Sequence, residues 1–333
     1  MTDTDAPLAI GSPGGVRAAI HPFGARIASL SVPGRDGPLE TVLDHATPRP
    51  PPDDKNYLGN TVGRVSGRIA KSCFVLDGAT CRLDPNEGAN HLHGGPGGFH
   101  ARSWTVLDHQ PDGANPQVVL ALRSPAGEGG YPGTLDVTAH FRIVADGLSV
   151  ELTGRCDLAT PAALTLHPYF NLSGDHRRDI GTHRLALNAG HYLELDPEFI
   201  PTGRLLPVDG TCFDFRTPRL IGNCAPDSPA LRATGGYDHT WVCDPRATWH
   251  ARLEHPETSI AMEVRSNQPS VQFYAGQYLR ARPGVAWRER CGLCLEPQAF
   301  PNAINEPAFP PVVLRPGDTY RNLIDYRFRQ DRA

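Results

Sequence analysis

The sequence predicts an all-β fold, a large β-sandwich formed as a single domain, and three observations support this. Apolar and polar residues alternate with a period of two along short stretches, which is typical of half-buried strands. Gly (34) and Pro (33) occur along the whole chain of 333 residues and leave little room for long helices. No strand–helix alternation, internal repeat or low-complexity linker is present, so we expect one domain over residues 1–333.

The expected strands follow one another at short intervals along the chain. The clearest pair is a hairpin, in which residues 135–143 and 148–153 alternate between apolar and polar side chains around a turn at 145–147. Further strands are expected at 117–123, 163–170, 184–188, 239–243, 259–265, 270–275 and 291–296, and a hairpin-like pair at 73–83 turns on Asp77 and Gly78. Many short strands with regular turns are typical of a sandwich or barrel.

Charge and cysteine content exclude several classes of function. The net charge is −4 without a basic stripe, so we expect no nucleic-acid partner. The N-terminus has no signal-peptide pattern and no stretch approaches the ~18 apolar residues that span a bilayer, so we expect a cytoplasmic protein without a membrane partner. Eight cysteines in such a chain predict reduced thiols. Cys291 and Cys294 form a single C-x-x-C without the second pair of a structural zinc site.

The segment TLHPYFNLSG (165–174) contains the first candidate catalytic residue, His167. In a strand, one face would carry Leu164, Leu166, Pro168 and Phe170, and the other Thr165, His167, Tyr169 and Asn171. His167 would thus share a face with a hydroxyl, a phenol and a carboxamide, as in the lining of a pocket. Pro168 cannot donate to a strand ladder, which predicts an edge or a bulge. The local pattern leaves a structural and a catalytic histidine as open alternatives.

The segment CGLCLEPQAFPNA (291–303) contains the second candidate, Glu296, near the end of an apolar stretch. Cys294, Glu296 and Gln298 would share one face of a strand. A carboxylate in this place is either solvated at the strand end, or desolvated with a raised pKa that suits a general base. The local sequence favours the solvated strand end.

Five further polar residues are candidates for binding a ligand. Arg64 and Arg68 lie four residues apart, and arginine is a natural hydrogen-bond donor to hydroxyls and carboxylates. His91 and His93 flank a leucine before a glycine-rich turn that lacks the Lys-Ser/Thr of a phosphate loop, and no third metal ligand is marked nearby. Asp238 opens a strand after a flexible turn. An exposed or structural role is the alternative for each of them.

In their order along the chain, these stretches resemble the aldose 1-epimerase (galactose mutarotase) family. The motifs are G-R-x-x-x-R-I at 63–69, N-E-G and L-H-G-G at 86–95, H-x-Y-F-N-L at 167–172, Y-D-H at 237–239, Q-F-Y at 272–274, and L-E-P-Q followed by F-P at 295–301. The resemblance covers about residues 15–328 and implies a galactose mutarotase-like supersandwich with a sugar site on its concave face. It also implies a free monosaccharide as the substrate, a monomer or homodimer, and neither a metal nor an organic cofactor.

The resemblance further implies roles for six residues. His167 would be the general acid and Glu296 the general base of sugar-ring opening. The residues implied to bind, orient or line the site of the sugar are Arg68, His93, Asp238 and Gln272. Two positions depart from the family pattern: Gly67 replaces a common Asn, and Pro168 replaces a common Thr or Ser. We expect these departures to affect which sugar fits more than the chemistry.

The expected function is therefore an aldose 1-epimerase, which interconverts the α and β anomers of a free sugar by acid/base ring opening and reclosure. A non-catalytic carbohydrate-binding or sensor module is the main alternative, because it uses the same Arg, His, Asp and aromatic residues. A glycoside hydrolase usually needs two carboxylates that face the scissile bond, and only Glu296 and Asp238 are candidates. The joint presence of a candidate acid and a candidate base favours the isomerase.

Overall fold

The described part of the chain is almost entirely β-structure. The computed structural model describes residues 6–45, 47–51, 54–223, 228–281, 284–285 and 287–330. These residues form 26 strands, five short 3-10 helices and one α-helix, α1 (Pro229–Ala233). The all-β prediction is confirmed. None of the helices among these residues has the length and apolar character needed to cross a membrane.

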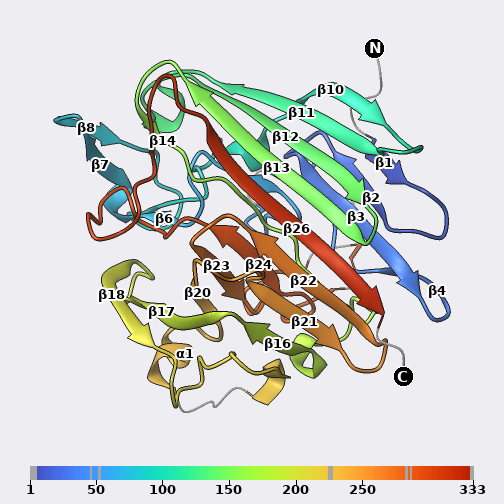
Figure 1. Cartoon of the computed structure of the whole chain (residues 1–333). Helices are drawn as coiled ribbons and strands as arrows, with labels where there is room; N and C mark the ends of the chain where they lie inside the picture. Colours follow the sequence, from blue (N-terminus) through green and yellow to red (C-terminus); the bar gives the residue numbers. More distant parts are fainter. Residues whose placement is uncertain are drawn as a thin grey trace.

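The largest element is an antiparallel sheet of nine strands. In spatial order its strands are β10 (Thr105–Gln110), β11 (Gln117–Ser124), β12 (Leu135–Val144), β13 (Gly147–Cys156), β26 (Tyr320–Gln330), β22 (Ile260–Ser266), β21 (Ala251–His255), β16 (Arg184–Leu187) and β19 (Arg219–Leu220). The predicted hairpin is β12–β13, in which Ala139 pairs with Leu152. Strand β26 joins this hairpin to β22, so the last strand of the chain lies in the middle of the sheet (Figure 1).

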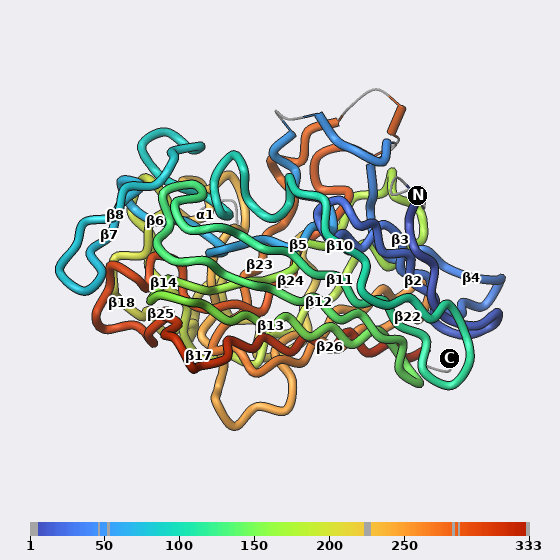
Figure 2. The backbone as a smooth tube through the Cα atoms, turned by 90° about the horizontal axis from the view of Figure 1, so that it is seen from above, coloured from blue at the N-terminus to red at the C-terminus, as the bar shows by residue number. Residues whose placement is uncertain are grey.

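Two further antiparallel sheets complete the main architecture. The four-stranded sheet contains β1 (Leu8–Gly11), β2 (Arg17–His21), β3 (Arg26–Gly34) and β4 (Gly37–Glu40). The five-stranded sheet contains β18 (Pro201–Pro207), β17 (Ala189–Leu195), β20 (Asp238–Cys243), β23 (Ser270–Tyr274) and β24 (Cys294–Gln298), in spatial order. Figure 2 shows β10 to β13 and β26 running beside one another along the molecule.

Four short two-stranded ladders complete the fold, and all but the β7–β8 hairpin connect segments that lie far apart in the sequence. The pairs are β5 (Thr61–Val62) with β15 (Thr165–Leu166), β6 (Arg68–Ile69) with β9 (His91–Leu92), β7 (Cys73–Leu76) with β8 (Ala79–Arg82), and β14 (Thr160–Pro161) with β25 (Val313–Leu314). The 3-10 helices are η1 (Ala70–Ser72), η2 (Phe99–Ala101), η3 (Glu128–Gly130), η4 (Ile180–Thr182) and η5 (Ile221–Asn223). The β6–β9 pair matters for function, because it places Arg68 opposite Leu92 and next to His93.

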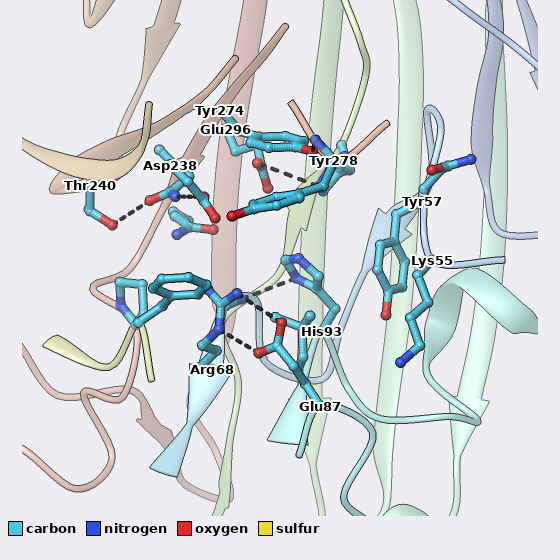
Figure 3. A pocket seen from close by; sticks show the side chains of 18 of the residues that line it. Lys55, Tyr57, Arg68, Glu87, His93, Asp238, Thr240, Tyr274, Tyr278 and Glu296 are labelled. Atoms are coloured by element: carbon cyan, nitrogen blue, oxygen red, sulfur yellow. Dashed lines mark hydrogen bonds and ion pairs between the residues drawn. The ribbon is translucent and has the colours of Figure 1, made fainter. Parts of the chain in front are cut away.

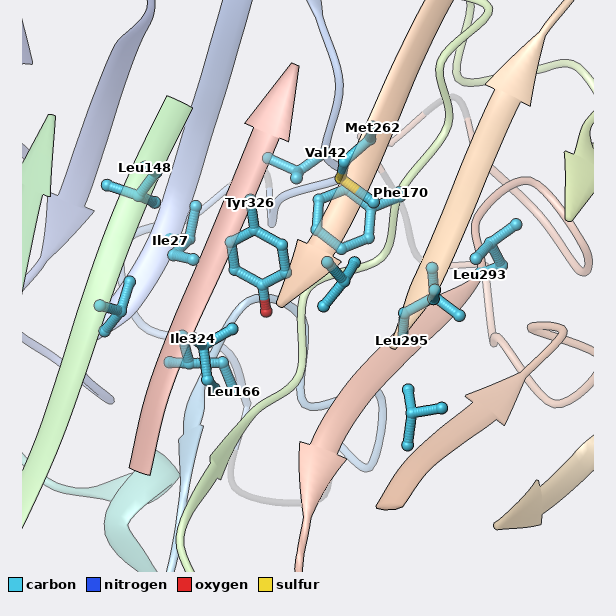
Figure 4. Packing of buried hydrophobic residues seen from close by; sticks show 14 of the residues in the cluster. Ile27, Val42, Leu148, Leu166, Phe170, Met262, Leu293, Leu295, Ile324 and Tyr326 are labelled. Atoms are coloured by element: carbon cyan, nitrogen blue, oxygen red, sulfur yellow. The ribbon is translucent and has the colours of Figure 1, made fainter. Parts of the chain in front are cut away.

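A single large cluster of buried apolar side chains lies between the sheets. It contains residues from Ile10 in β1 to Phe328 in β26, and all three large sheets contribute to it. In Figure 4, Ile27 of β3, Leu295 of β24 and Tyr326 of β26 belong to the same packed cluster. One apolar face of each sheet is covered by another sheet, as in a β-sandwich. This explains why apolar and polar residues alternate along the strands.

The segment predicted as a strand at 163–170 is mostly irregular. Only Thr165–Leu166 forms a regular strand, β15, flanked by isolated bridges at Ala163 and Phe170. The backbone N–H of His167 donates to the carbonyl of Asn60 at 2.9 Å, and Pro168 has no N–H with which to continue a ladder. The strand predicted at 291–296 is likewise shifted, because β24 begins at Cys294 and extends to Gln298.

Candidate active site

The six predicted site residues line one pocket of about 450 Å³. They come from β6 and its neighbour β9, from the irregular segment after β15, and from β20, β23 and β24. In Figure 3, Arg68 and Glu87 lie on one side of the pocket, and Tyr274, Tyr278 and Glu296 lie on the opposite side. The complete lining is Lys55, Asn56, Tyr57, Gly67, Arg68, Asn86, Glu87, Leu92, His93, His167, Tyr169, Leu195, Phe199, Asp238, Thr240, Gln272, Tyr274, Tyr278, Arg280, Glu296, Gln298 and Pro301.

His167 and Glu296 face each other deep in the pocket, with Nε2 of His167 3.7 Å from Oε1 of Glu296. Glu296 points into the pocket because its neighbour Leu295 points into the core, as the alternation of a strand requires. His167 is fixed through its backbone, which bonds the carbonyl of Asn60 and the N–H of Gly59. Only 5% of His167 and 2% of Glu296 is exposed to solvent, so both groups are largely desolvated.

Burial shifts the pKa values of this pair in opposite directions. It raises the pKa of Glu296 well above its usual value, and the negative charge of Asp238 adds to this shift. Burial also lowers the pKa of His167 to about 4. The expectation that Glu296 is a solvated strand end is therefore wrong, since packing around β24 removes water from the carboxyl group. Its Oε2 atom is buried and has no hydrogen-bond partner among the described residues.

Three neighbouring strands place a row of polar groups next to Glu296. Thr240 of β20 pairs with Gln272 of β23, and Gln272 pairs with Glu296 of β24. The hydroxyl of Thr240 donates to Oε1 of Gln272 at 2.5 Å, and Nε2 of Gln272 donates to Oδ1 of Asp238 at 2.7 Å. The orientation of the Asp238 carboxylate is thus set by Gln272, which leaves its second oxygen for a ligand.

Arg68 is held by an acid that the sequence interpretation did not single out. Its Nε and one terminal nitrogen donate to the two carboxylate oxygens of Glu87 at 2.5 and 2.9 Å, a bidentate ion pair. The guanidinium also lies over the ring of Phe199, with its carbon 5.1 Å from the ring centre. The N-E-G motif at 86–88 contains Glu87 and could have marked it as a candidate. Its role as the partner of Arg68 is evident only from the pairing of β6 with β9.

The tautomer of His93 follows from its contact with Gly67. The backbone N–H of Gly67 donates to Nδ1 of His93 at 3.2 Å. Burial lowers the pKa of His93 well below its usual value, so the ring is neutral at pH 7 and its proton resides on Nε2. The ring of Tyr57 packs edge-on against His93, with ring centres 4.9 Å apart. His93 is therefore arranged as a hydrogen-bond donor, which suits a sugar hydroxyl.

Gly67 itself gives the pocket a wall of bare backbone. Its φ of +68° favours glycine, and a Cβ at this position would lie 2.9 Å from Cβ of Pro301. The asparagine common in the resembling family therefore does not fit here without a shift of Pro301. This departure is built into the packing of the site.

Arg64 and His91, the other members of the two motifs, do not line the pocket. Arg64 is buried and donates five hydrogen bonds to Ser124, Pro125, Pro132 and Thr160. Nδ1 of His91 contacts the carbonyl of Asp84 at 2.7 Å, and its Nε2 contacts the hydroxyl of Tyr131 at 2.8 Å. Both residues therefore hold the structure together. Thr165 and Asn171 also bond to backbone carbonyls and leave the pocket wall to His167 and Tyr169.

One set of potential metal ligands gathers within the described residues, namely His167, Cys294 and Glu296, whose ligand atoms lie within 4.8 Å of one another. The sulfur of Cys294 lies 3.5 Å from Nδ1 of His167, whereas Glu296 faces Nε2. Cys294 is not among the residues that line the pocket. The prediction that the protein needs no metal or organic cofactor stays a prediction.

Comparison with known proteins shows the family to which the chain is related. Residues 8–327 match the family model described as aldose 1-epimerase. The chain belongs to the aldose 1-epimerase family. It is 36% identical to the galactose mutarotase of Homo sapiens over 320 residues, which covers 94% of this chain and 91% of that protein. It is 33% identical to the aldose 1-epimerase of Escherichia coli over 324 residues, which covers 94% and 92%.

Solved structures agree with this membership of the aldose 1-epimerase family. The GalM/aldose epimerase homologue from C. elegans superposes with a TM-score of 0.89 at 30% identity, covering 98% of this chain and 99% of that one. The galactose 1-epimerase from Lactobacillus acidophilus superposes with a TM-score of 0.85 at 25% identity, covering 97% and 94%. The predicted family and fold are confirmed, and the chain is an aldose 1-epimerase, an isomerase.

Proposed function

We propose that this aldose 1-epimerase opens and closes the ring of a free monosaccharide with His167 as the general acid and Glu296 as the general base. The observation that carries the proposal is the buried pair itself, with its facing atoms 3.7 Å apart on the wall of a pocket of about 450 Å³. Glu296 removes the proton of the C1 hydroxyl while His167 protonates the ring oxygen, and the ring bond at C1 breaks. Rotation about C1–C2 and the reverse transfers then close the other anomer.

The pair needs only one mobile proton for the whole cycle. Before ring opening the reactive form is an ion pair, with a carboxylate on Glu296 and an imidazolium on His167. After ring opening Glu296 holds the proton and His167 is neutral. Burial favours this uncharged form, because it raises the pKa of Glu296 and lowers that of His167. The desolvated site therefore stabilises the pair in the state that accompanies the open aldehyde, at the cost of forming the ion pair first.

The remaining predicted residues fit the task of holding sugar hydroxyls. His93 offers the N–H of a neutral ring, since Gly67 occupies its other nitrogen. Asp238 offers a carboxylate oxygen on the far side of its bond to Gln272. Arg68 keeps a positive charge in the pocket despite its pair with Glu87. Donors and acceptors thus face the pocket from different walls, which fixes the orientation of a polyhydroxylated ring.

The two alternative functions have less support from this geometry. A glycoside hydrolase usually needs two carboxyl groups that act on the scissile bond, whereas Asp238 accepts from Gln272 through one oxygen and is assigned to a sugar hydroxyl through the other. A pure binding site has no use for an acid and a base that are both desolvated and within 3.7 Å of each other. The isomerase uses both the acid and the base that the pocket presents.

The test is the rate of anomer exchange, followed by polarimetry or NMR on freshly dissolved single anomers of galactose, glucose, pentoses and 6-deoxy sugars. We expect acceleration of at least one of these sugars, and loss of that acceleration in both His167→Gln and Glu296→Gln. A matched control is His91→Gln, which removes a buried histidine that does not line the pocket. Full activity in either of the two pocket variants would sink the assigned roles.

The domain organisation, the location and the oligomeric state of the protein are also proposals. We propose a single domain, a cytoplasmic location and a monomer or homodimer in solution. The large buried cluster that takes side chains from all three main sheets supports the single domain. Light scattering on the purified chain and a single cooperative unfolding transition are the corresponding measurements.

A further inference from the structure

Cys294 is a second buried neighbour of the proposed acid, and its sulfur lies within 4.8 Å of a carboxylate oxygen of Glu296. Its sulfur is 3.5 Å from Nδ1 of His167, and neither side chain is more than 6% exposed. Cys294 precedes Glu296 by two residues in β24, so the two side chains leave the same face of that strand. One strand therefore contacts both nitrogens of His167, with a thiol at Nδ1 and a carboxyl group at Nε2.

The proposed chemistry places a strict requirement on Nδ1. A histidine that exchanges its proton at Nε2 passes between imidazolium and neutral imidazole, and the Nδ1 proton stays in place in both forms. A neutral ring with its proton on Nε2 instead has no lone pair there with which to take back the proton from the ring oxygen. The Nδ1–H form is maintained only where an acceptor faces Nδ1.

Among the groups packed around His167, Cys294 is the side chain that contacts Nδ1, and the backbone carbonyl of His167 itself also accepts a hydrogen bond from the ring. His93, Tyr57, Tyr169 and Tyr274 all present their rings to the imidazole, with ring centres between 5.1 and 6.5 Å away. The hydroxyl of Tyr169 is a second hydrogen-bond partner of the Cys294 sulfur. The thiol is thus fixed between a phenol and the imidazole, which limits its rotation.

We propose that Cys294 is a positioning residue, whose sulfur accepts a hydrogen bond from Nδ1–H of His167 and so keeps Nε2 as the nitrogen that exchanges the proton. The inference rests on the proposed function of His167. Sulfur is a weak acceptor, so its removal has a moderate effect: kcat falls by about 10-fold while KM changes by less than about 2-fold. A purely structural role for Cys294 would lower stability without changing the tautomer of His167.

The test compares Cys294→Ala and Cys294→Ser with the control Cys291→Ala. Cys291 is also fully buried and belongs to the same small apolar cluster, but the sulfur that contacts Nδ1 of His167 is that of Cys294. The full chain is labelled with ¹⁵N-histidine, and the His167 signals are identified by their absence in His167→Gln. At pH 7 the ring is neutral, so its ¹⁵N shifts report which nitrogen holds the proton.

We expect the Nδ1–H form in the unmodified protein, a gain of the Nε2–H form together with the loss in kcat in Cys294→Ala, and recovery of most of both in Cys294→Ser. An Nε2–H form in the unmodified protein overturns the inference, as does an equal loss of kcat in Cys291→Ala. Failure of the proposed function gives a different result, because His167→Gln would then retain activity whatever the tautomer.

Discussion

Arg64 and Arg68 lie four residues apart in one motif, yet Arg64 belongs to a buried structural region and Arg68 to the pocket. Polar groups have different hydrogen-bond partners in these two regions. Arg64 is 2% exposed, and its hydrogen bonds go to carbonyls and hydroxyls of the surrounding strands and loops. Arg68 lines the pocket and shares its charge with Glu87. The pair His91 and His93 repeats this division, because both nitrogens of His91 contact protein atoms, whereas Nδ1 alone of His93 is engaged by the backbone.

The two regions differ in whether buried polar atoms all have hydrogen-bond partners within the protein. Around Arg64 the protein satisfies its own polar groups, which is the usual rule for buried atoms. In the pocket it does not: Oε2 of Glu296 and Oε1 of Gln298 are buried without a hydrogen-bond partner among the described residues. Buried atoms away from the pocket, such as Oγ of Ser66 and the hydroxyl of Tyr326, are also without a partner among the described residues, but the two on the pocket wall are within reach of a ligand.

The largest expected effect comes from removing the base in the pocket. In Glu296→Gln the proton acceptor is lost, and we expect kcat for anomer exchange to fall by about 10³-fold. The melting temperature should stay the same or rise, since a carboxyl group buried without a partner for Oε2 is replaced by an amide of equal shape. NMR exchange rates and thermal melts check the two parts. If Glu296→Gln keeps more than a tenth of the parent activity, the assignment of Glu296 as the base is wrong.

The second effect is expected in the structural region. Arg64→Met leaves the carbonyls of Ser124, Pro125 and Pro132 without their donor, and we expect the free energy of unfolding to fall by about 3 kcal/mol. The kcat per folded molecule should be unchanged, because Arg64 does not line the pocket. Urea unfolding and activity at a temperature well below the transition separate the two. Arg123→Met, at an exposed ion pair with Asp136, is the control and should cost less than about 1 kcal/mol.

A smaller effect is expected when the charge of Arg68 is kept but its shape is changed. Lysine cannot form the bidentate pair with Glu87, so the cation is no longer held in one orientation for the sugar. We expect Arg68→Lys to raise KM by about 10-fold and to change kcat by less than about 3-fold. Initial rates over a range of sugar concentrations measure both constants. A loss confined to kcat would place Arg68 in the chemical step and not in binding.

The smallest expected change is in the pH dependence of the unmodified protein. Because the pKa of His167 is lowered to about 4, its ring stays neutral from pH 7 down to near that value. Burial raises the pKa of Glu296 well above its usual value, which favours retention of its proton as the pH rises. We therefore expect kcat/KM to vary by less than about 2-fold between pH 5 and 7. A histidine with the ordinary pKa of ~6.5 would instead produce a clear fall in this window.

Much of the site could be predicted because strand alternation and motif order are local properties. The opposite directions of Leu295 and Glu296 follow from one strand, and all six predicted residues do line the same pocket. The desolvation of Glu296 could not be predicted, because it depends on depth below the surface, which no local pattern records. Glu87 was missed for a similar reason: its partner Arg68 lies 19 residues earlier and is reached through the β6–β9 pairing. The irregular path around His167 reflects Pro168 and contacts with Asn60.

The central place of β26 has a consequence for how the protein is made. Its residues 320–330 pair with β13 on one side and β22 on the other, so the nine-stranded sheet is divided in two until they arrive. During synthesis the edges of β13 and β22 therefore wait unpaired on the ribosome, since the strand that joins them is translated after both. Unpaired strand edges promote association between chains.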